Sequence, residues 1–325
     1  MKKKIFGSIV LVLGVAFCYL FIGNAPRQEH VLWGANFSQK QVESLGLDWK
    51  ETFLAILDDL GARRLKIGVH WDLVEPEKGK YYFEDVDWQM KELEQRKGKA
   101  ILVIGMKTPR WPECHIPSWA QSKEEQQEAI LLMIKEVVGR YQNSPALLSW
   151  QVENEPFFPF GQCPWVDAAF LKSEIGLVHS LDSSHPVVVS ESGEGSLWIQ
   201  AAMHGDIVGT TIYRKVWFKQ LEAYIEYPFP PVFYWRKAVL VDALFHKEVI
   251  GVELQAEPWG PDPISRSSLE EQEKSMNLDR FRNVVEFAKN TGLPEQYFWG
   301  AEWWYWMKKE KGSSLIWDEA KNLPW

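Results

Sequence analysis

The stretch LLSWQVENEPF ends an apolar run with closely spaced carboxylates. Glu153 and Glu155 flank Asn154, and Pro156 stops the run. A carboxyl group can give or take a proton, and an amide can hold a hydroxyl group by hydrogen bonding. This arrangement is therefore a candidate for proton transfer to a bound ligand. The alternative is a salt-bridge network that only supports the fold.

A second apolar run, EVIGVELQAEPWG, offers two further carboxylates, Glu253 and Glu257. By alternation along a strand, these two side chains share a face. Two carboxylates held across a cleft are the minimal machinery for glycoside hydrolysis. One protonates the leaving oxygen, and the other attacks the anomeric carbon or activates water. The two runs together could supply such a pair.

The elements that must position these residues are predicted strands alternating with helices. Eight apolar, β-rich segments cover residues 31–37, 63–71, 100–107, 147–155, 186–192, 206–213, 248–257 and 296–304. Several are nearly continuous apolar runs, which is typical of strands covered on both faces. Helical patterns occur between them, notably at residues 49–61, 83–98, 122–143 and 278–292.

This alternation predicts a single closed (β/α)8 barrel. A doubly wound open sheet is the alternative, but no glycine-rich phosphate turn follows the first predicted strand. In such barrels the functional site lies at the carboxyl ends of the strands. Polar residues that close the predicted strands are therefore the candidates for function.

The sequence WQVENEPF resembles the fourth-strand signature of the clan A glycoside hydrolases, which include cellulases, mannanases and β-galactosidases. The resemblance implies that Glu155 is the general acid/base, that Asn154 binds the sugar 2-hydroxyl group, and that Glu153 is structural. The clan takes its nucleophile from the end of the seventh strand. This implies Glu253, with Glu257 as the alternative and, if not the nucleophile, as a residue lining the cleft.

Further matches extend over most of residues 31 to 306. The segment that begins at Trp71, WDLVEPEKGKYYFEDVDW, resembles the one after the second strand in several clan families, and we select Trp71 as a substrate-binding residue. Tyr213 closes the sixth strand, where the clan places a tyrosine that hydrogen-bonds the nucleophile. The resemblance implies an aromatic platform for the sugar at Trp299, with Trp303 as the alternative.

Two departures weaken assignment to an individual family. The clan usually has an arginine near the end of the second strand. Here Lys66 stands near that place and Arg64 precedes it, and we select Arg64 as the substrate-binding residue. The sixth strand often reads His-x-Tyr in the clan, whereas Thr211 takes the place of the histidine here. A retaining pair would hold its carboxyl groups about 5–5.5 Å apart, with Glu155 protonated near neutral pH.

The loops after the third and fourth strands carry Cys114 and Cys163. They lie above the same face of the predicted barrel, so we expect a disulfide that joins them, with two unpaired thiols as the alternative. A metal site on Cys114 and His115 is disfavoured because adjacent ligands lack the usual spacing. The sequence predicts neither a metal nor another cofactor.

The N-terminus is predicted to be a separate module, residues 1–26, followed by one barrel domain, residues 27–325. Three lysines precede an uncharged apolar run at residues 5–23, close to the roughly 20 residues that a membrane helix requires. This pattern predicts a membrane anchor, with a cleaved signal peptide as the alternative. In either case the barrel domain is expected outside the cytoplasm.

Composition narrows the class of partner. The 325-residue chain has a net charge of -8 and no basic cluster beyond its first four residues, which argues against nucleic-acid binding. Its 18 tryptophans exceed what a core needs and suit a cleft that stacks on sugar rings. We expect a retaining glycosidase acting on a β-linked oligo- or polysaccharide. The alternative is an inactive sugar-binding barrel. The particular sugar and the oligomeric state stay open.

Overall fold

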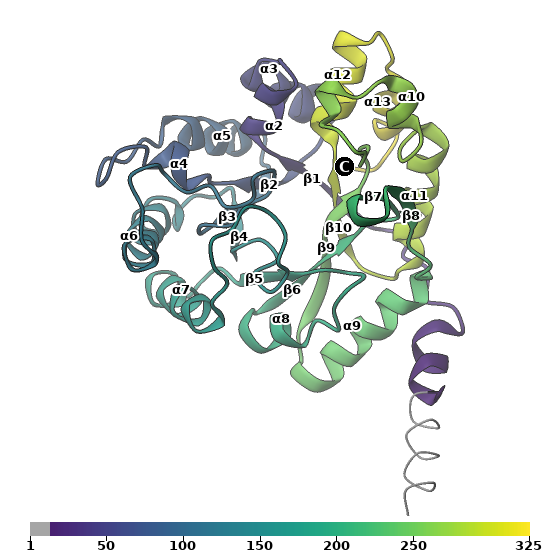
Figure 1. Ribbon diagram of the computed structural model, residues 1–325, viewed down its shortest axis with the longest axis horizontal. Coiled ribbons are helices and arrows are strands. Elements are labelled where there is room, and N and C mark those ends of the chain that lie inside the picture. Colours follow the sequence, from purple (N-terminus) through teal and green to yellow (C-terminus); the bar gives the residue numbers. More distant parts are fainter. Residues whose placement is uncertain (1–13) are drawn as a thin grey trace, which may run out of the picture.

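The computed structural model describes residues 14–325 and contains a closed barrel of eight parallel strands (Figure 1). Around the barrel the strands follow the order β1-β10-β9-β6-β5-β4-β3-β2. Their bounds are β1 (Leu32–Phe37), β2 (Arg64–Gly68), β3 (Lys99–Ile104), β4 (Leu147–Val152), β5 (Val187–Glu191), β6 (Ile207–Ile212), β9 (Glu248–Gln255) and β10 (Glu295–Trp299). The predicted (β/α)8 barrel is confirmed.

Helices cover the outside of the barrel (Figure 1). They are α2 (Gln39–Ser44), α3 (Trp49–Leu54), α4 (Trp71–Val74), α5 (Glu84–Gln95), α6 (Lys123–Tyr141), α7 (Ala168–Leu181), α8 (Ile199–His204), α9 (Pro231–Phe245), α10 (Leu269–Glu273), α11 (Leu278–Asn290), α12 (Ala301–Glu310) and α13 (Leu315–Ala320). A π-helical turn, Ala55–Asp59, follows α3, and 3-10 turns occupy Lys219–Leu221 and Ile264–Arg266.

Helix α6 shows why the sequence pattern was informative. The Ser122 hydroxyl accepts the backbone N–H of Glu125 at 3.2 Å, which satisfies one of the free donors at the helix start. Ile130, Ile134 and Val137 lie on one face and are fully buried. The capping residue and the apolar stripe therefore start the helix and hold it against the barrel.

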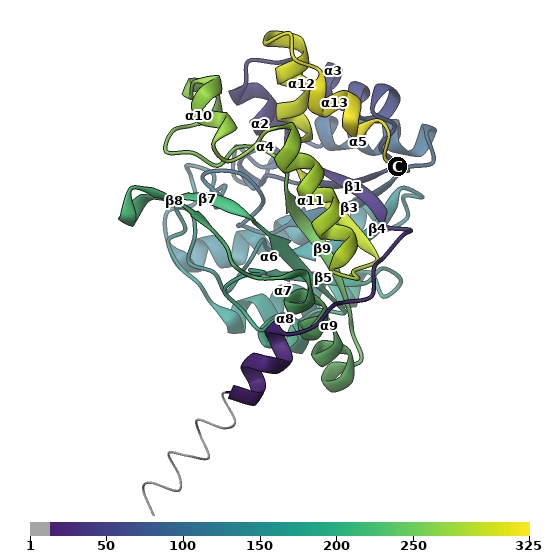
Figure 2. The same cartoon turned by 90° about the vertical axis from the view of Figure 1, so that its right-hand side faces the viewer.

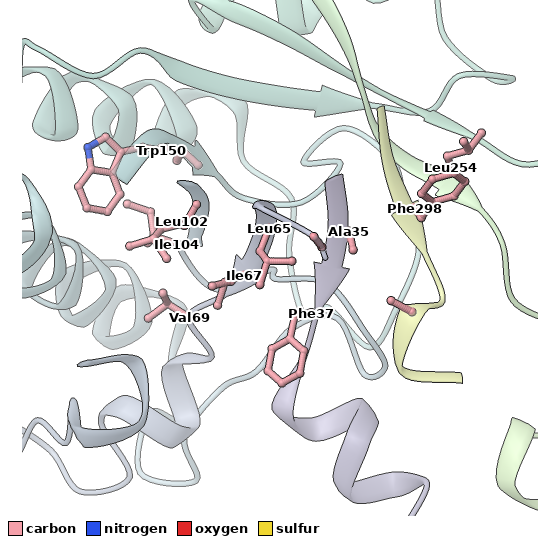
Figure 3. Packing of buried hydrophobic residues seen from close by; sticks show 14 of the residues in the cluster. Ala35, Phe37, Leu65, Ile67, Val69, Leu102, Ile104, Trp150, Leu254 and Phe298 are labelled. Atoms are coloured by element: carbon pink, nitrogen blue, oxygen red, sulfur yellow. The ribbon is translucent and has the colours of Figure 1, made fainter. Parts of the chain in front are cut away.

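The core forms two layers, as the alternation of strand residues requires. Leu65 and Ile67 of β2 belong to the larger cluster between strands and helices, part of which appears in Figure 3. Lys66, between them, points into the barrel and reaches Glu253 on β9. A smaller apolar cluster is formed by Ile101, Val188, Ile250, Val252 and Tyr297, from strands β3, β5, β9 and β10.

The eighth strand is shorter than predicted. It ends at Trp299, and the predicted strand residues after it form the start of α12. Gly300 separates the two elements with φ +137°, and a Cβ at this position would lie 2.7 Å from the Cβ of Glu257. A glycine is needed here because the backbone turns sharply against a neighbouring strand end.

An antiparallel hairpin not expected from the sequence follows β6. It pairs β7 (Lys215–Phe218) with β8 (Ala223–Glu226). Figure 2 shows the hairpin and α10 projecting on the same side of the barrel. Because they follow β6 and β9, this is the side of the carboxyl ends of the strands, where the candidate site lies.

The predicted anchor, residues 5–23, lies partly outside the described residues. Residues 14–21 are helical, and Phe21 packs against Phe229 and Phe233 with ring centroids 6.0 and 5.1 Å apart. Within residues 14–325, no helix has the length and apolar character needed to cross a membrane.

Candidate active site

The chain leaves regular strand geometry directly after β4. Glu153 and Glu155 have φ angles of +59° and +44°, in the left-handed region that non-glycine residues seldom adopt. In a regular strand, Asn154 and Glu155 would face opposite sides of the sheet. The irregular backbone instead lets both side chains contact residues at the carboxyl end of the barrel.

Glu155 is held in a nearly closed position, 8% exposed. Its Oε1 accepts a hydrogen bond from the Thr211 hydroxyl at 3.2 Å, and its backbone N–H donates to Ser190 Oγ at 2.9 Å. Burial, together with the nearby negative charge of Glu253, raises the pKa of Glu155 to about 8. The carboxyl group is therefore protonated at neutral pH and can act as an acid.

Glu253 stands on β9 with both carboxylate oxygens hydrogen-bonded. Lys66 Nζ donates to Oε1 at 2.9 Å, and the Tyr213 hydroxyl donates to Oε2 at 2.9 Å. Burial and the charges of Glu253 and Glu155 hold the pKa of Tyr213 well above its usual value, so the phenol keeps its proton. Lys66 also donates to Asn154 Oδ1 at 3.3 Å, and it thereby links the ends of β4 and β9.

Glu257, the alternative nucleophile, lies in a separate network. It accepts hydrogen bonds from Arg110 Nη1 and from Trp299 Nε1, the latter at 2.9 Å. Arg110 also pairs with Glu302 at 3.0 Å, and its guanidinium carbon lies 4.0 Å from the centroid of the Trp299 ring. These contacts fix Trp299 at the end of β10 and leave Glu253 as the carboxylate next to Glu155.

Glu153 occupies a supporting position, as the resemblance implied. Its two carboxylate oxygens accept the backbone N–H groups of Met106 at 2.7 Å and Lys107 at 2.5 Å. It therefore ties the end of β4 to the loop after β3. Glu174 of α7 lies beside it, and burial raises the pKa of both carboxyl groups.

Three sequence-predicted binding residues are placed elsewhere. Trp71 is fully buried and donates to Glu75 at 2.8 Å. Trp303 lies on α12, only 2% exposed, and donates to Gln272 at 2.8 Å. Neither indole nitrogen is bonded to Glu155 or Glu253, and sugar binding by these two rings stays a prediction.

Arg64 was a wrong choice. It begins β2, and its guanidinium pairs with Glu295, which begins β10, at 3.0 Å. Both residues lie at the amino end of the barrel, opposite the candidate site. Lys66, two residues further on, supplies the buried positive charge instead.

Sequence reasoning missed a third carboxylate in the site. Glu113, in the loop after β3, is 5% exposed, and its Oε2 accepts a hydrogen bond from Asn154 Nδ2 at 3.2 Å. Burial and the charge of Glu253 raise the pKa of Glu113 to about 7. Its position directly before Cys114, in a loop above the predicted site, was the signal that could have found it.

Cys114 and Cys163 form a disulfide with a Cα–Cα distance of 5.2 Å. It joins the loop that carries Glu113 to the loop that follows Glu155, and it leaves Cys114 with no thiolate for a metal. The disulfide predicted from the loop positions is present.

Replacing Cys114 and Cys163 together by serine should lower the free energy of unfolding. The bridge spans 49 residues, so its loss should cost about 2 to 4 kcal/mol because the unfolded chain gains freedom. Urea denaturation of both proteins measures this cost. Cys18→Ser is the matched control, since Cys18 is a free, exposed thiol. Equal unfolding midpoints for the double variant and the wild type would refute the role of the bridge.

Comparisons with solved structures find the same barrel fold in proteins of 13–15% sequence identity. The GH5_18 protein of Bifidobacterium longum subsp. longum, solved in complex with Manb1-4GlcNAc, superposes with a TM-score of 0.60 at 13% identity, over 83% of this chain and 69% of that one. An exo-beta-1,4-mannosidase from Opitutaceae bacterium strain TAV5 superposes with a TM-score of 0.57 at 13% identity, over 85% of this chain and 53% of that one. The beta-galactosidase of Halorubrum lacusprofundi superposes with a TM-score of 0.54 at 15% identity, over 82% of this chain and 52% of that one.

A shorter stretch is similar in sequence to curated proteins. Over 78 residues the chain is 38% identical to a probable mannan endo-1,4-beta-mannosidase A-2 of Aspergillus terreus, which covers 23% of this chain and 18% of that protein. The A-1 protein of the same organism is 35% identical over 74 residues, 23% of this chain and 19% of its own. The chain thus matches less than a fifth of the length of these relatives. No protein-family model matches it.

Proposed function

We propose that this protein is an O-glycosyl hydrolase that cleaves β-glycosidic bonds with retention of configuration. Glu155 is the general acid/base and Glu253 the nucleophile. The observation that carries the proposal is the contrast between the two carboxyl groups. Glu155 is kept protonated by burial and by the nearby charge of Glu253, whereas both oxygens of Glu253 are held by hydrogen bonds, from Lys66 and from Tyr213.

In the first step, a carboxylate oxygen of Glu253 attacks the anomeric carbon. The bond from that carbon to the glycosidic oxygen breaks, and its electron pair leaves with the oxygen. Glu155 gives its proton to this oxygen, so the leaving group departs as an alcohol. The product is a glycosyl ester on Glu253 and a carboxylate on Glu155.

In the second step, the Glu155 carboxylate takes a proton from water. The water oxygen attacks the anomeric carbon, and the ester bond breaks with its electron pair returning to Glu253. Both side chains regain their starting states, and the net reaction adds one water to the glycosidic bond. The Tyr213 hydroxyl group and Lys66 hold Glu253 in place through both steps.

Asn154 and Trp299 are proposed to hold the sugar. Asn154 follows from the resemblance and from its place beside Glu155. Trp299 stands at the end of β10 with its ring nitrogen fixed by Glu257. The names of the similar proteins point to a β-linked oligo- or polysaccharide, in the first instance a mannoside or galactoside.

A panel of aryl β-glycosides tests the function, with release of the phenol as the readout. Proton NMR of the first-formed product gives the stereochemistry, because a retaining enzyme releases the β-anomer before mutarotation. Binding without hydrolysis across the panel would favour an inactive sugar-binding barrel. Release of the α-anomer would contradict the double displacement.

The pH dependence of hydrolysis should report the pKa of Glu155. With that pKa raised to about 8, kcat/KM should be flat through neutral pH and fall as the pH rises above about 8, because deprotonated Glu155 has no proton to give. Glu155→Gln, assayed with an aryl glycoside whose leaving group needs no protonation, should lose this alkaline limb. A limb that persists in Glu155→Gln would assign it to another group.

We also propose that the apolar run at residues 5–23 anchors the barrel domain to a membrane, outside the cytoplasm. The three lysines before this run and its lack of charge support the proposal. Recovery of the full chain in the membrane fraction after an alkaline wash would be the expected result. Recovery of a shortened chain in the soluble fraction would show cleavage instead.

A further inference from the structure

The candidate site holds one more carboxyl group than double displacement requires. Three buried carboxyl groups, Glu113, Glu155 and Glu253, surround Asn154. Lys66 donates to Glu253 and to Asn154, so its charge is already engaged. The nearby Lys107 donates to the backbone oxygens of Glu155 and Phe158. The third carboxyl group, Glu113, therefore has no role in the two steps described above.

Glu113 also lacks a salt-bridge partner of opposite charge. Within residues 14–325 it forms no salt bridge, and its one side-chain hydrogen bond is the contact from Asn154 to Oε2. Its Oε1 accepts no hydrogen bond from the described protein. This oxygen is not among the fully buried atoms that lack a partner, so it keeps access to solvent and is free to bind a ligand, although the residue as a whole is only 5% exposed.

The backbone around Glu113 holds the side chain in place. Glu113 has φ +73°, its N–H donates to the Arg110 carbonyl at 2.7 Å, and its carbonyl accepts the Thr108 N–H at 2.9 Å. The next residue, Cys114, is tied by the disulfide to the loop after β4. The carboxyl group is thus preorganised next to the amide of Asn154, as a specificity group must be.

We propose that Glu113 determines substrate specificity by binding a cationic amino group on the sugar, at the carbon next to the anomeric centre. The preferred substrate class is then a β-glycoside of a 2-amino-2-deoxy sugar with a free amine. The inference rests on the proposed function and names the substrate class of the same site. It places the amine at Oε1 of Glu113, on the carboxyl group that Asn154 holds. Asn154 is the neighbour of Glu155 in the chain, and Glu155 must reach the glycosidic oxygen.

Electrostatics favours a cation over a hydroxyl group at this position. Burial and the charge of Glu253 raise the pKa of Glu113 to about 7, although the charges of Lys107 and Lys66 oppose this rise. A neutral hydroxyl group leaves the repulsion between Glu113 and Glu253 in place. An ammonium group would offset that repulsion and would pair with Oε1. Acetylation of the amine removes the charge and adds bulk, so an N-acetylated sugar should lose this advantage.

The test compares matched 4-nitrophenyl β-glycosides that differ only at the 2-position: free amine, hydroxyl and N-acetyl. Each set is assayed in gluco, galacto and manno configurations with the full chain. In at least one configuration, the free amine should have the highest kcat/KM. Glu113→Gln keeps the shape and the contact to Asn154 but not the charge. It should lower the ratio of amine to hydroxyl kcat/KM by about 10- to 100-fold, the range for a hydrogen bond to a charged group.

One control variant separates the outcomes. Glu113→Asp keeps the charge and should retain part of the preference, which a purely structural role for Glu113 would not predict. Unchanged amine selectivity in Glu113→Gln, or a wild type that prefers the hydroxyl substrate throughout, would overturn the inference while leaving the glycosidase intact. If the wild type cleaves none of the substrates, the proposed function itself fails.

Discussion

Glu253→Gln should reduce kcat/KM for an activated aryl β-glycoside by about 10⁴- to 10⁶-fold, the scale seen when a covalent nucleophile is removed. Glutamine keeps the size of the side chain, and its one amide oxygen can still accept one of the two hydrogen bonds that Glu253 accepts from Lys66 and Tyr213. What it loses is the negative oxygen that forms the glycosyl ester. The fold should therefore stay intact while the first step stops, which circular dichroism and initial rates measure separately.

Glu257→Gln is the matched control for this loss. Glu257 stands on the same chain segment, but it accepts hydrogen bonds from Arg110 and Trp299 and lies outside the Lys66 and Tyr213 contacts. Its replacement should weaken the position of Trp299 and cost activity by about 10- to 100-fold, as for the loss of a charged hydrogen bond. A larger loss in Glu257→Gln than in Glu253→Gln would reverse the assignment.

Lys66→Met should destabilise the protein by about 3 to 5 kcal/mol, because it leaves the buried Glu253 carboxylate without its counter-charge. Lys66 is fully buried in its side chain and is the cation paired with Glu253. The same change removes the hydrogen bond that holds one carboxylate oxygen of the nucleophile in place. We expect kcat to fall by about 10²- to 10³-fold, comparable to removing one preorganised donor. Urea denaturation and initial rates give the two effects.

Lys66→Arg separates charge from shape. Arginine keeps the positive charge, so it should retain more of both stability and activity than methionine does. Its planar group still has to fit a fully buried position, so the wild-type values should not be reached. Equal losses in the two variants would show that packing around Lys66, and not its charge, is what matters.

The barrel could be predicted from the sequence because its strands are continuous apolar runs separated by capped helices. All eight predicted segments contain the observed strands or overlap them closely, and the clearest helix, α6, begins at its capping serine. The ends of the strands were harder to predict. The tryptophans at 303 and 304 have the same hydrophobic character in a strand as in a helix, and Gly300 alone marks where β10 ends.

The residues of the candidate site could be predicted where their position depends on the order of the strands. They could not be predicted where it depends on how far along its strand a residue lies. Glu155, Glu253, Asn154 and Tyr213 close three strands and come together at one end of the barrel. Arg64 and Lys66 share a face of β2, but two residues along a strand amount to about 6.6 Å. That distance places Arg64 beside Glu295 at the amino end of the barrel. Hydrophobic periodicity shows which face of a strand a residue lies on, but not which end of the barrel it is near.

Loops were the least predictable part. Glu113 reaches Asn154 from a loop whose course depends on left-handed residues and on a disulfide, neither of which follows from hydrophobic periodicity. The same holds for the left-handed Glu153 and Glu155, which bring Asn154 and Glu155 to one side of the barrel. The sequence could name the members of the site more reliably than their contacts.

The most direct test of the central claim is to trap the covalent intermediate and map the labelled residue. Incubation with 5-fluoro-β-glycosyl fluorides, which keep the 2-substituent, slows breakdown of the glycosyl ester so that it accumulates. Mass spectrometry of the intact protein should then show one added glycosyl group, and peptide mapping should place it on Glu253. A label on Glu257, or turnover with no covalent adduct and an α-configured product, would contradict the account.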